Sequence, residues 1–334
     1  MISEIPHEWE SHVLAWRRIN QRHRVKLQNG WAPSRNDEYH FYQTLMGTWP
    51  LVASTVEEMH QYQERLEKYM IKAVKEAKEH TSWINPSEDY EQAVTGFVRG
   101  VLHQGKTNPF LDDFLPLVKR IGRFGLLNSI SETLLQLTSP GVPDIYQGNE
   151  LWDFSLVDPD NRRAVNFSAF RERFSELQRV NHEGKQQLPA LMDVLEDGTM
   201  KMLITWRVLC YRKQNPQLFQ KGNYLPLEVQ GARKDSLCAF AREYKGKQVI
   251  VMAGRFFAGL YGDRAQAAAT PGGEIWQDTR VMLPAAFRKN DFINLFNEEK
   301  YFPALAEKMT FLEAARVLNS CPVAVLVGGG ADNR

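Results

Sequence analysis

Residues 139–167, SPGVPDIYQGNELWDFSLVDPDNRRAVNF, form the stretch of this sequence best suited to binding a sugar. The stretch combines aromatic rings, which stack on the apolar face of a sugar ring, with carboxylates and amides that hydrogen-bond to hydroxyl groups. The candidates at and after the end of its apolar run, residues 142–146, are Tyr146, Gln147, Asn149, Glu150, Trp152 and Asp153. Their types predict a carbohydrate-binding loop.

Four charged residues further along the same stretch have two interpretations. Asp158, Asp160, Arg162 and Arg163 either pair with one another and brace the loop, or reach the sugar. Bracing is the favoured interpretation, because opposite charges that lie close together in a compact loop commonly pair. A sugar-binding role for Asp158, Arg162 and Arg163 stays open beside it.

The elements around this stretch predict where its side chains stand. An apolar helix over residues 125–137, a short buried strand over 142–146, an acidic loop and a helix over 168–181 follow one another, as in one unit of an α/β barrel. Functional groups of barrel enzymes stand at the C-terminal ends of the strands, where Tyr146 and its successors would lie. Because a lone strand has open edges, we expect helices or another chain, such as a second copy, to cover it.

The first 135 or so residues are predicted to be nearly all helical, without a convincing strand. Helices are expected over residues 3–30, 33–50, 53–80, 87–102 and 108–136. Ser34 or Asn36 suits the cap of the second helix, with Asp37 and Glu38 in its first turn. For Asp37, Glu38 and Tyr39, capping and packing stand beside a role in substrate binding, and both interpretations stay open.

Two other features of this part have a structural and a functional interpretation. The cations between Arg17 and Lys26 are favoured as a solvated helix face, with nucleic-acid binding as the weaker alternative. Trp31 and Trp49 are expected in a core or an interface rather than as stacking rings for a sugar.

The remainder of the chain predicts a small antiparallel β domain. Short β-rich runs such as YLPLEV, SLCAFARE and KQVIVMAG alternate with turns over residues 222–334, with a short helix near 311–319 and a mobile loop at 262–273. The chain is therefore expected to be a multi-domain α+β protein. The expected domains are a helical insertion region (1–124), the last barrel strand and helix with flanking helices (125–221), and the β domain (222–334).

Composition excludes several classes of protein. The 334 residues carry a net charge of +1, which leaves no global field for nucleic acid or an anionic membrane. Cys210, Cys238 and Cys321 are far apart, which argues against a disulfide framework and a zinc site. The sequence shows no signal peptide and no apolar run of about 18 residues, so a cytoplasmic protein is expected. No metal and no cofactor are implied.

The long run LTSPGVPDIYQGNELWDFSLVDPDNRRAVNF closely resembles the last barrel strand and following loop of maltooligosyltrehalose synthases, members of the α-amylase superfamily (glycoside hydrolase family 13). WRRINQRHR and NDEYHFYQTLMGTWP resemble the helical insertion of that family. RKQNPQLFQKGNYLPLEVQGARKDSLCAFARE resembles the start of its C-terminal β domain. The resemblance runs in order over most of the chain.

The resemblance implies an intramolecular transglycosylation in trehalose biosynthesis. This isomerase reaction converts the reducing-end α-1,4 linkage of a maltooligosaccharide into an α,α-1,1 linkage. The chemistry needs a nucleophilic carboxylate and an acid/base carboxylate, and a third carboxylate helps to distort and hold the sugar.

The motifs that carry those acids in the family are not matched here. Val98-Arg99-Gly100 is the nearest echo of the nucleophile motif and has no acid, and Asn181-His182-Glu183 stands in the wrong order for the third. The family's third catalytic acid is expected just upstream of ISEIPHEW. The resemblance therefore implies a C-terminal portion with no catalytic residue of its own, which is expected to be inactive alone. The alternative is a non-catalytic protein that binds glucan or scaffolds an N-terminal catalytic half.

Overall fold

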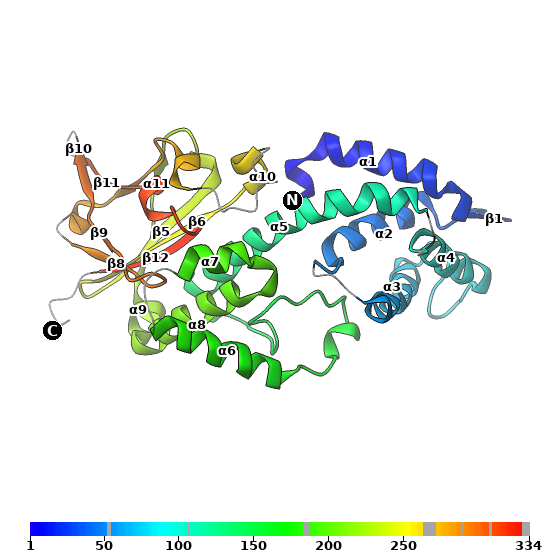
Figure 1. The fold of residues 1–334 in the computed structure, drawn as a ribbon, viewed down its shortest axis with the longest axis horizontal. Coiled ribbons are helices and arrows are strands. Elements are labelled where there is room, and N and C mark those ends of the chain that lie inside the picture. The colour runs from blue at the N-terminus through cyan, green and yellow to red at the C-terminus, as the bar shows by residue number, and fades with distance from the viewer. Residues whose placement is uncertain are drawn as a thin grey trace. The chain divides into compact units, whose positions relative to one another are not determined.

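The computed structural model describes residues 1–51, 55–103, 105, 107–182, 187–262, 272–288, 290–306 and 309–328 (Figure 1). The chain divides into two compact units. The helical unit comprises Ile2–Gly122 and Phe154–Ala164, and the mixed unit comprises Met1, Arg123–Asp153 and Val165–Arg334. Of the loop predicted at 262–273, residues 263–271 lie outside the described residues.

The helical unit is built from amphipathic helices around an aromatic core. Its helices are α1 (Pro6–Ile19), α2 (Arg35–Thr48), α3 (Val56–Ala77), α4 (Glu88–Val101) and the first part of α5 (Pro109–Thr138). Ser34 caps α2, since its Oγ accepts a hydrogen bond from the Asp37 backbone N–H at 3.1 Å. Trp16 is completely buried and packs edge-on against Phe110 and Phe114. The predicted helices after residue 33 are thus present in this unit.

A β-hairpin replaces the second half of the first predicted helix. The helix α1 ends at Ile19, a short 3-10 turn follows, and β1 (Val25–Leu27) pairs antiparallel with β2 (Gly30–Ala32). The turn residues are Gln28 and Asn29, and Gly30, which follows them at the start of β2, has the positive φ of +129° that favours glycine. The predictions of one helix over 3–30 and of no strand in this region are wrong.

The mixed unit contains the end of α5, several further helices and all of the described strands from β3 onward. Its other helices are α6 (Phe167–His182), α7 (Gln187–Asp193), α8 (Thr199–Gln214), α9 (Pro216–Lys221), α10 (Phe257–Tyr261) and α11 (Ala314–Val317). The helix predicted at 168–181 is confirmed, α7 and α8 are among the flanking helices expected before residue 221, and α11 lies within the short helix expected near 311–319.

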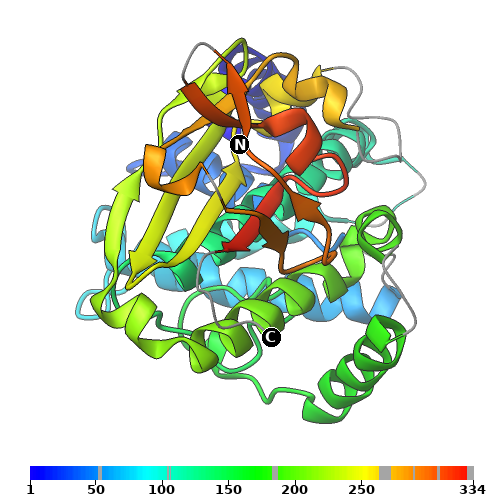
Figure 2. The ribbon, with the colours of Figure 1, turned by 90° about the vertical axis from the view of Figure 1, so that its left-hand side faces the viewer.

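The strands after residue 222 form two antiparallel sheets. Their bounds are β3 (Asn223–Pro226), β4 (Val229–Gln230), β5 (Leu237–Tyr244), β6 (Lys247–Gly254), β7 (Arg280–Leu283), β8 (Phe292–Asn294), β9 (Lys300–Tyr301), β10 (Ala304–Ala306), β11 (Met309–Glu313) and β12 (Val323–Gly328). One sheet has the order β3-β5-β6-β12-β8-β9 and the other β10-β11-β7-β4. Figure 2 shows the long strands β5 and β6 side by side in yellow. The predicted antiparallel β region is confirmed.

Residues 142–146 do not form the predicted strand. Their backbone carries no strand pairing, and Val142 is 95% and Tyr146 64% exposed. A parallel barrel strand makes its hydrogen bonds only with neighbouring strands, and no strand among the described residues pairs with this segment. The prediction of a buried strand here is wrong, although α5 and α6 flank the segment as expected.

A buried arginine joins three elements of the mixed unit. Arg242 on β5 is only 2% exposed and has no acidic partner within the described part of the chain. Its guanidinium instead donates hydrogen bonds to backbone carbonyl oxygens of Thr138 (3.3 Å), Leu218 (3.4 Å), Phe219 (2.9 Å), Gly222 (3.0 Å) and Asn223 (3.3 Å). One planar donor group therefore satisfies the carbonyls at the ends of α5 and α9 and at the start of β3.

Replacing Arg242 tests how much its hydrogen bonds contribute to the free energy of unfolding. Arg242→Met keeps the apolar stem and removes every donor, so several buried carbonyls lose their partners. We expect the free energy of unfolding to fall by at least about 3 kcal/mol. Urea denaturation followed by circular dichroism measures the change, and Arg280→Met, on the exposed side of β7, is the control. A similar loss in both variants would contradict this role.

Candidate functional site

The segment around Trp152 is fixed by the start of α8 in the mixed unit. Lys201 on α8 donates from Nζ to the Leu151 carbonyl oxygen at 3.1 Å and lies 5.5 Å from the centre of the Trp152 ring. The Trp152 Nε1–H donates to the Leu195 carbonyl oxygen at 2.8 Å. Gly198 has φ +80°, and a Cβ there would lie 3.1 Å from the Trp152 backbone nitrogen. Trp152 is therefore half-buried and held in place, rather than a free ring.

Lys201 also shapes the electrostatics of this segment. Its burial lowers the pKa of the ammonium group, and the nearby carboxylates of Asp153, Glu150 and Glu132 act in the opposite direction. The half-buried ammonium group therefore fixes the Leu151 carbonyl and also offsets the negative charge of the carboxylates nearby.

The other predicted residues of this unit differ in their exposure. Tyr146 and Gln147 are exposed, and no hydrogen bond holds the Tyr146 ring within the described residues. Glu150 is half-buried, and its Oε2 is buried without a hydrogen-bond partner among them. Gly148, between them, has a positive φ of +90°. Tyr146 is thus the most accessible aromatic ring of the predicted sugar-binding set.

The predicted charged residues of the loop lie in the helical unit and are tied to α3. Arg65 on α3 makes a bidentate contact with Asp160, with both nitrogen–oxygen distances at 2.8 Å. Arg65 also donates to the Phe154 carbonyl oxygen at 3.1 Å, and Lys72 donates to the Asp158 carbonyl oxygen at 2.5 Å. Two cations of one helix therefore hold this part of the loop.

The pairs within the loop match the bracing interpretation. Arg162 forms an ion pair with Asp158, and Arg163 Nε lies 3.3 Å from an Asp160 carboxylate oxygen. Arg163 also donates to the Ser155 hydroxyl at 3.0 Å. The side chains of Asp158 and Arg162 remain 48% and 75% exposed, so bracing leaves much of their polar surface accessible.

Neutralising Asp160 should loosen the loop in a pH-dependent way. Burial acts to raise the pKa of Asp160, but the Arg65 and Leu156 hydrogen bonds and the charges of Arg65 and Arg163 outweigh it and lower the pKa. The ionised carboxylate therefore stabilises the fold above its ordinary pKa of 3.8, and this stability is lost as the pH falls through the lower, folded-state pKa. Asp160→Asn should cost about 1 to 3 kcal/mol at pH 7.

Urea denaturation of both proteins at pH 7 and at about pH 3 measures this difference, which should shrink at the lower pH. Asp158→Asn is the matched control, because its ion pair is largely exposed and contributes little. A difference between wild type and Asp160→Asn that stays constant with pH would show that the carboxylate charge is not responsible.

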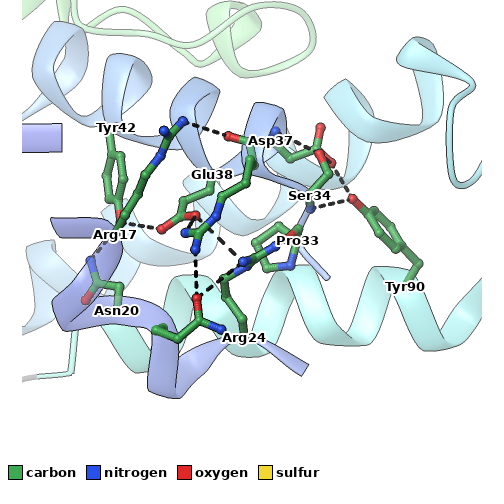
Figure 3. A network of polar contacts seen from close by, with 11 residues as sticks. Arg17, Asn20, Arg24, Pro33, Ser34, Asp37, Glu38, Tyr42 and Tyr90 are labelled. Carbon is green, nitrogen blue, oxygen red and sulfur yellow. Dashed lines mark hydrogen bonds and ion pairs between the residues drawn. The ribbon is translucent and has the colours of Figure 1, made fainter. Parts of the chain in front are cut away.

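Glu38 lies at the centre of a polar network in the helical unit (Figure 3). It is completely buried, and its two oxygens accept from Arg35 Nη1 at 2.7 Å and from the Tyr42 hydroxyl at 2.9 Å. Arg24 Nε lies 4.0 Å away and donates to the Pro33 carbonyl oxygen. Arg24 is thus a buried structural residue, unlike the solvated cation predicted for this cluster.

The neighbours of Glu38 are also engaged within the unit. One Asp37 oxygen accepts from the Ser34 hydroxyl at 2.7 Å and from the Tyr90 hydroxyl (Figure 3). Burial and the Asp37 hydrogen bond raise the pKa of Tyr90, so its hydroxyl stays a proton donor. The Tyr39 hydroxyl accepts from Trp9 Nε1 at 3.0 Å. Asp37, Glu38 and Tyr39 therefore each have a structural partner.

The two tryptophans singled out in this region differ. Trp49 packs on Tyr62 and Phe114, with ring centres 5.7 and 5.1 Å away, and belongs to the aromatic core. Trp31 is 45% exposed on β2, and the Arg24 guanidinium lies 5.7 Å from its ring centre. Trp31 therefore packs against one cation and is not a core residue of the helical unit.

Four cations that hold the loop were not among the residues predicted from the sequence. These are Arg65, Lys72, Lys201 and Arg212, which donate to backbone carbonyls of residues 137–158. Arg65 and Lys72 are seven residues apart and so share one face of α3, which was a readable signal. Lys201 lies between Met200 and Met202, and Arg212 lies beside Lys213 in the last turn of α8, so neither has a partner cation at helical spacing that would have marked it.

Four further observations concern metal binding, membranes, thiols and the Asn181-His182-Glu183 stretch. Among the described residues, no group of three or more histidines, cysteines, aspartates or glutamates is arranged to hold a metal ion. No helix in the described part of the chain is long and apolar enough to cross a membrane. The three cysteines are free thiols, of which Cys210 is exposed and Cys321 buried. The Asn181-His182-Glu183 stretch cannot be placed at a site, because Glu183 lies outside the described residues.

Comparisons with known proteins decide the family. No family model matches the chain. The putative maltooligosyl trehalose synthase of Mycobacterium tuberculosis is 32% identical over 225 residues, which are 67% of this chain and 26% of that protein. The solved maltooligosyltrehalose synthase of Arthrobacter ramosus matches 98% of this chain with a TM-score of 0.69 and 29% identity. This chain is homologous to the maltooligosyltrehalose synthases.

The homology covers only part of those enzymes. The chain spans about a quarter of the curated synthases and 35% of the Arthrobacter chain. A structure described as a hypothetical maltooligosyl trehalose synthase from Sulfolobus tokodaii gives the same picture, with a TM-score of 0.62, 26% identity and coverage of 98% and 35%. This partial coverage fits the C-terminal portion of a synthase that the resemblance implies.

Proposed function

We propose that this chain is the C-terminal part of a maltooligosyltrehalose synthase and supplies glucan-binding surface, while the catalytic carboxylates belong to the part that it does not span. One observation carries the proposal: 98% of the chain matches the fold of a solved synthase and spans 35% of it. The cytoplasmic location expected from the dispersed cysteines is part of the same proposal.

The environment of the acids supports a non-catalytic role. A retaining mechanism needs two carboxylates about 5 Å apart that flank the glycosidic bond and approach it freely. Glu38 is enclosed by Arg35 and Tyr42, and Asp160 is held by Arg65. Carboxylates locked in this way favour a structural role, so we assign no catalytic residue to this chain.

The proposed glucan contacts follow the exposure of the loop. Tyr146 offers a ring face, with Gln147 and Glu150 as hydrogen-bonding neighbours and Trp152 as the fixed base of the segment. Asp158, Arg162 and Arg163 are proposed as further contacts that also brace the loop. Asp37, Glu38 and Tyr39 are proposed to act on substrate through the position of α2, because their polar atoms already have partners.

An assay with maltopentaose tests the proposed division of labour. The pure chain should leave the concentration of reducing ends unchanged. A mixture with the part of a synthase that this chain does not span should lower it, because the α,α-1,1 product has no reducing end. Loss of reducing ends with the chain alone would overturn the proposal. Glucan binding without activity in the mixture would favour the alternative, a non-catalytic glucan-binding protein.

The stacking role of Tyr146 has a direct test. Tyr146→Ala removes the exposed ring without emptying a core, and the loss of one stacking contact corresponds to roughly a threefold to tenfold weaker affinity. Isothermal titration of the chain with maltopentaose measures the change. Tyr224→Ala is the control, since Tyr224 is also exposed and lies on β3 outside the loop. Equal effects of the two substitutions would remove Tyr146 from the site.

A further inference from the structure

A cavity lies between α6 and α8 within the mixed unit and has no assigned role. Its volume is about 420 Å³, and its wall includes Phe167, Phe170, Phe174 and Trp206. The rings of Phe174 and Trp206 meet edge-on with their centres 5.2 Å apart. Phe167 is 51% exposed at the start of α6. An aromatic surface of this kind is open to solvent, where it loses the stabilisation that burial would add.

The polar groups at this cavity are incompletely paired. Glu150 lines it, and the buried Oε2 of this residue has no hydrogen-bond partner among the described residues. Arg171 and Lys213 also line the cavity, and neither forms an ion pair with any residue that the structure describes. A buried acceptor without a hydrogen-bond donor destabilises the protein, so a ligand that supplies a donor to Glu150 Oε2 would fit this wall.

The solved homologue indicates where such a group could come from. The chain spans 35% of the Arthrobacter synthase, so nearly two thirds of that polypeptide lies outside the matching region and is available to contact it. A glucan stacks on one exposed ring such as that of Tyr146, but several rings surround this cavity, so most of the hydroxyl groups of a glucan there would lose their hydrogen bonds to water. A polypeptide segment offers the required pairing of an apolar side chain with a hydrogen-bond donor.

We propose that the cavity between α6 and α8 is the docking site for the part of a synthase that this chain does not span. An apolar side chain of that part enters among Phe167, Phe170 and Trp206, and a donor beside it, such as a lysine or arginine, binds Glu150 Oε2. Carboxylates of the partner pair with Arg171 and Lys213. This assignment rests on the proposed function, because the partner that binds the cavity is the catalytic part of that synthase.

The exposed thiol of Cys210 provides a reporter, because Cys210 lines the cavity. The experiment uses the whole chain with the half-buried Cys238 changed to serine, while Cys321 is buried and unreactive. The probe is the portion of the Arthrobacter ramosus synthase outside the region that matches this chain. Alkylation of Cys210 by a maleimide, followed by mass spectrometry, should be at least about tenfold slower with saturating probe. Maltopentaose alone should leave the rate unchanged.

Substitutions in the wall locate the contact. Phe167→Ala and Glu150→Gln should each weaken association with the probe, measured by sedimentation velocity, by about tenfold. Phe256→Ala should not, since Phe256 is similarly exposed in the mixed unit and does not line the cavity. Phe167 and Phe256 are both surface residues, and glutamine matches glutamate in size, so all three variants are expected to fold.

The outcomes separate this inference from the proposed function. Association and restored activity with Cys210 still reactive would overturn the docking site and leave the synthase proposal standing. Slowing of the reaction by maltopentaose would assign the cavity to glucan instead. No association and no activity would overturn both.

Discussion

The conformation of residues 139–166 depends on hydrogen bonds from long cationic side chains to its backbone carbonyls. This segment forms no strand and only one short 3-10 turn, so it lacks a ladder of its own to satisfy its backbone groups. In the mixed unit, Arg212 donates to the carbonyls of Leu137 and Gly141, and Lys201 donates to that of Leu151. In the helical unit, Arg65 on α3 donates to the Phe154 carbonyl, and Lys72 on the same helix donates to the Asp158 carbonyl.

This arrangement explains why a loop rich in acids is ordered. Lys201 and Arg65 each bind a carbonyl and also lie near carboxylates of the loop, Lys201 near Glu150 and Asp153 and Arg65 at Asp160, so negative charge of the loop is offset where the backbone is fixed. The long side chains also reach across several ångströms, which lets a rigid helix hold a segment that has no regular structure. The carbonyls of Leu151 and Asp158 are held in this way, and Tyr146 is left exposed between elements that are fixed.

The hydrogen-bond partners of the buried acids distinguish those with a structural role from those that are available for binding. Glu38 and Asp37 are charged or polar groups enclosed by arginines and tyrosines, and buried charges persist in proteins only when they are paired. Glu150 differs, because one of its oxygens is buried without a partner beside an aromatic cavity. An incomplete polar group next to an apolar surface is what a protein interface leaves behind when its partner is absent.

Local patterns were enough to determine most helices, the antiparallel strands after residue 222 and the cap at Ser34, because each depends on neighbours a few residues away. The resemblance carried by residues 137–167 was also readable from the sequence alone. Only the tertiary structure decided that 142–146 is not a strand, since a strand exists only with a partner strand. It also decided that Asp160 pairs with Arg65, 95 residues away, and that Glu38 is enclosed rather than exposed. These outcomes depend on which distant groups fold into contact, and residue types and spacing do not specify that.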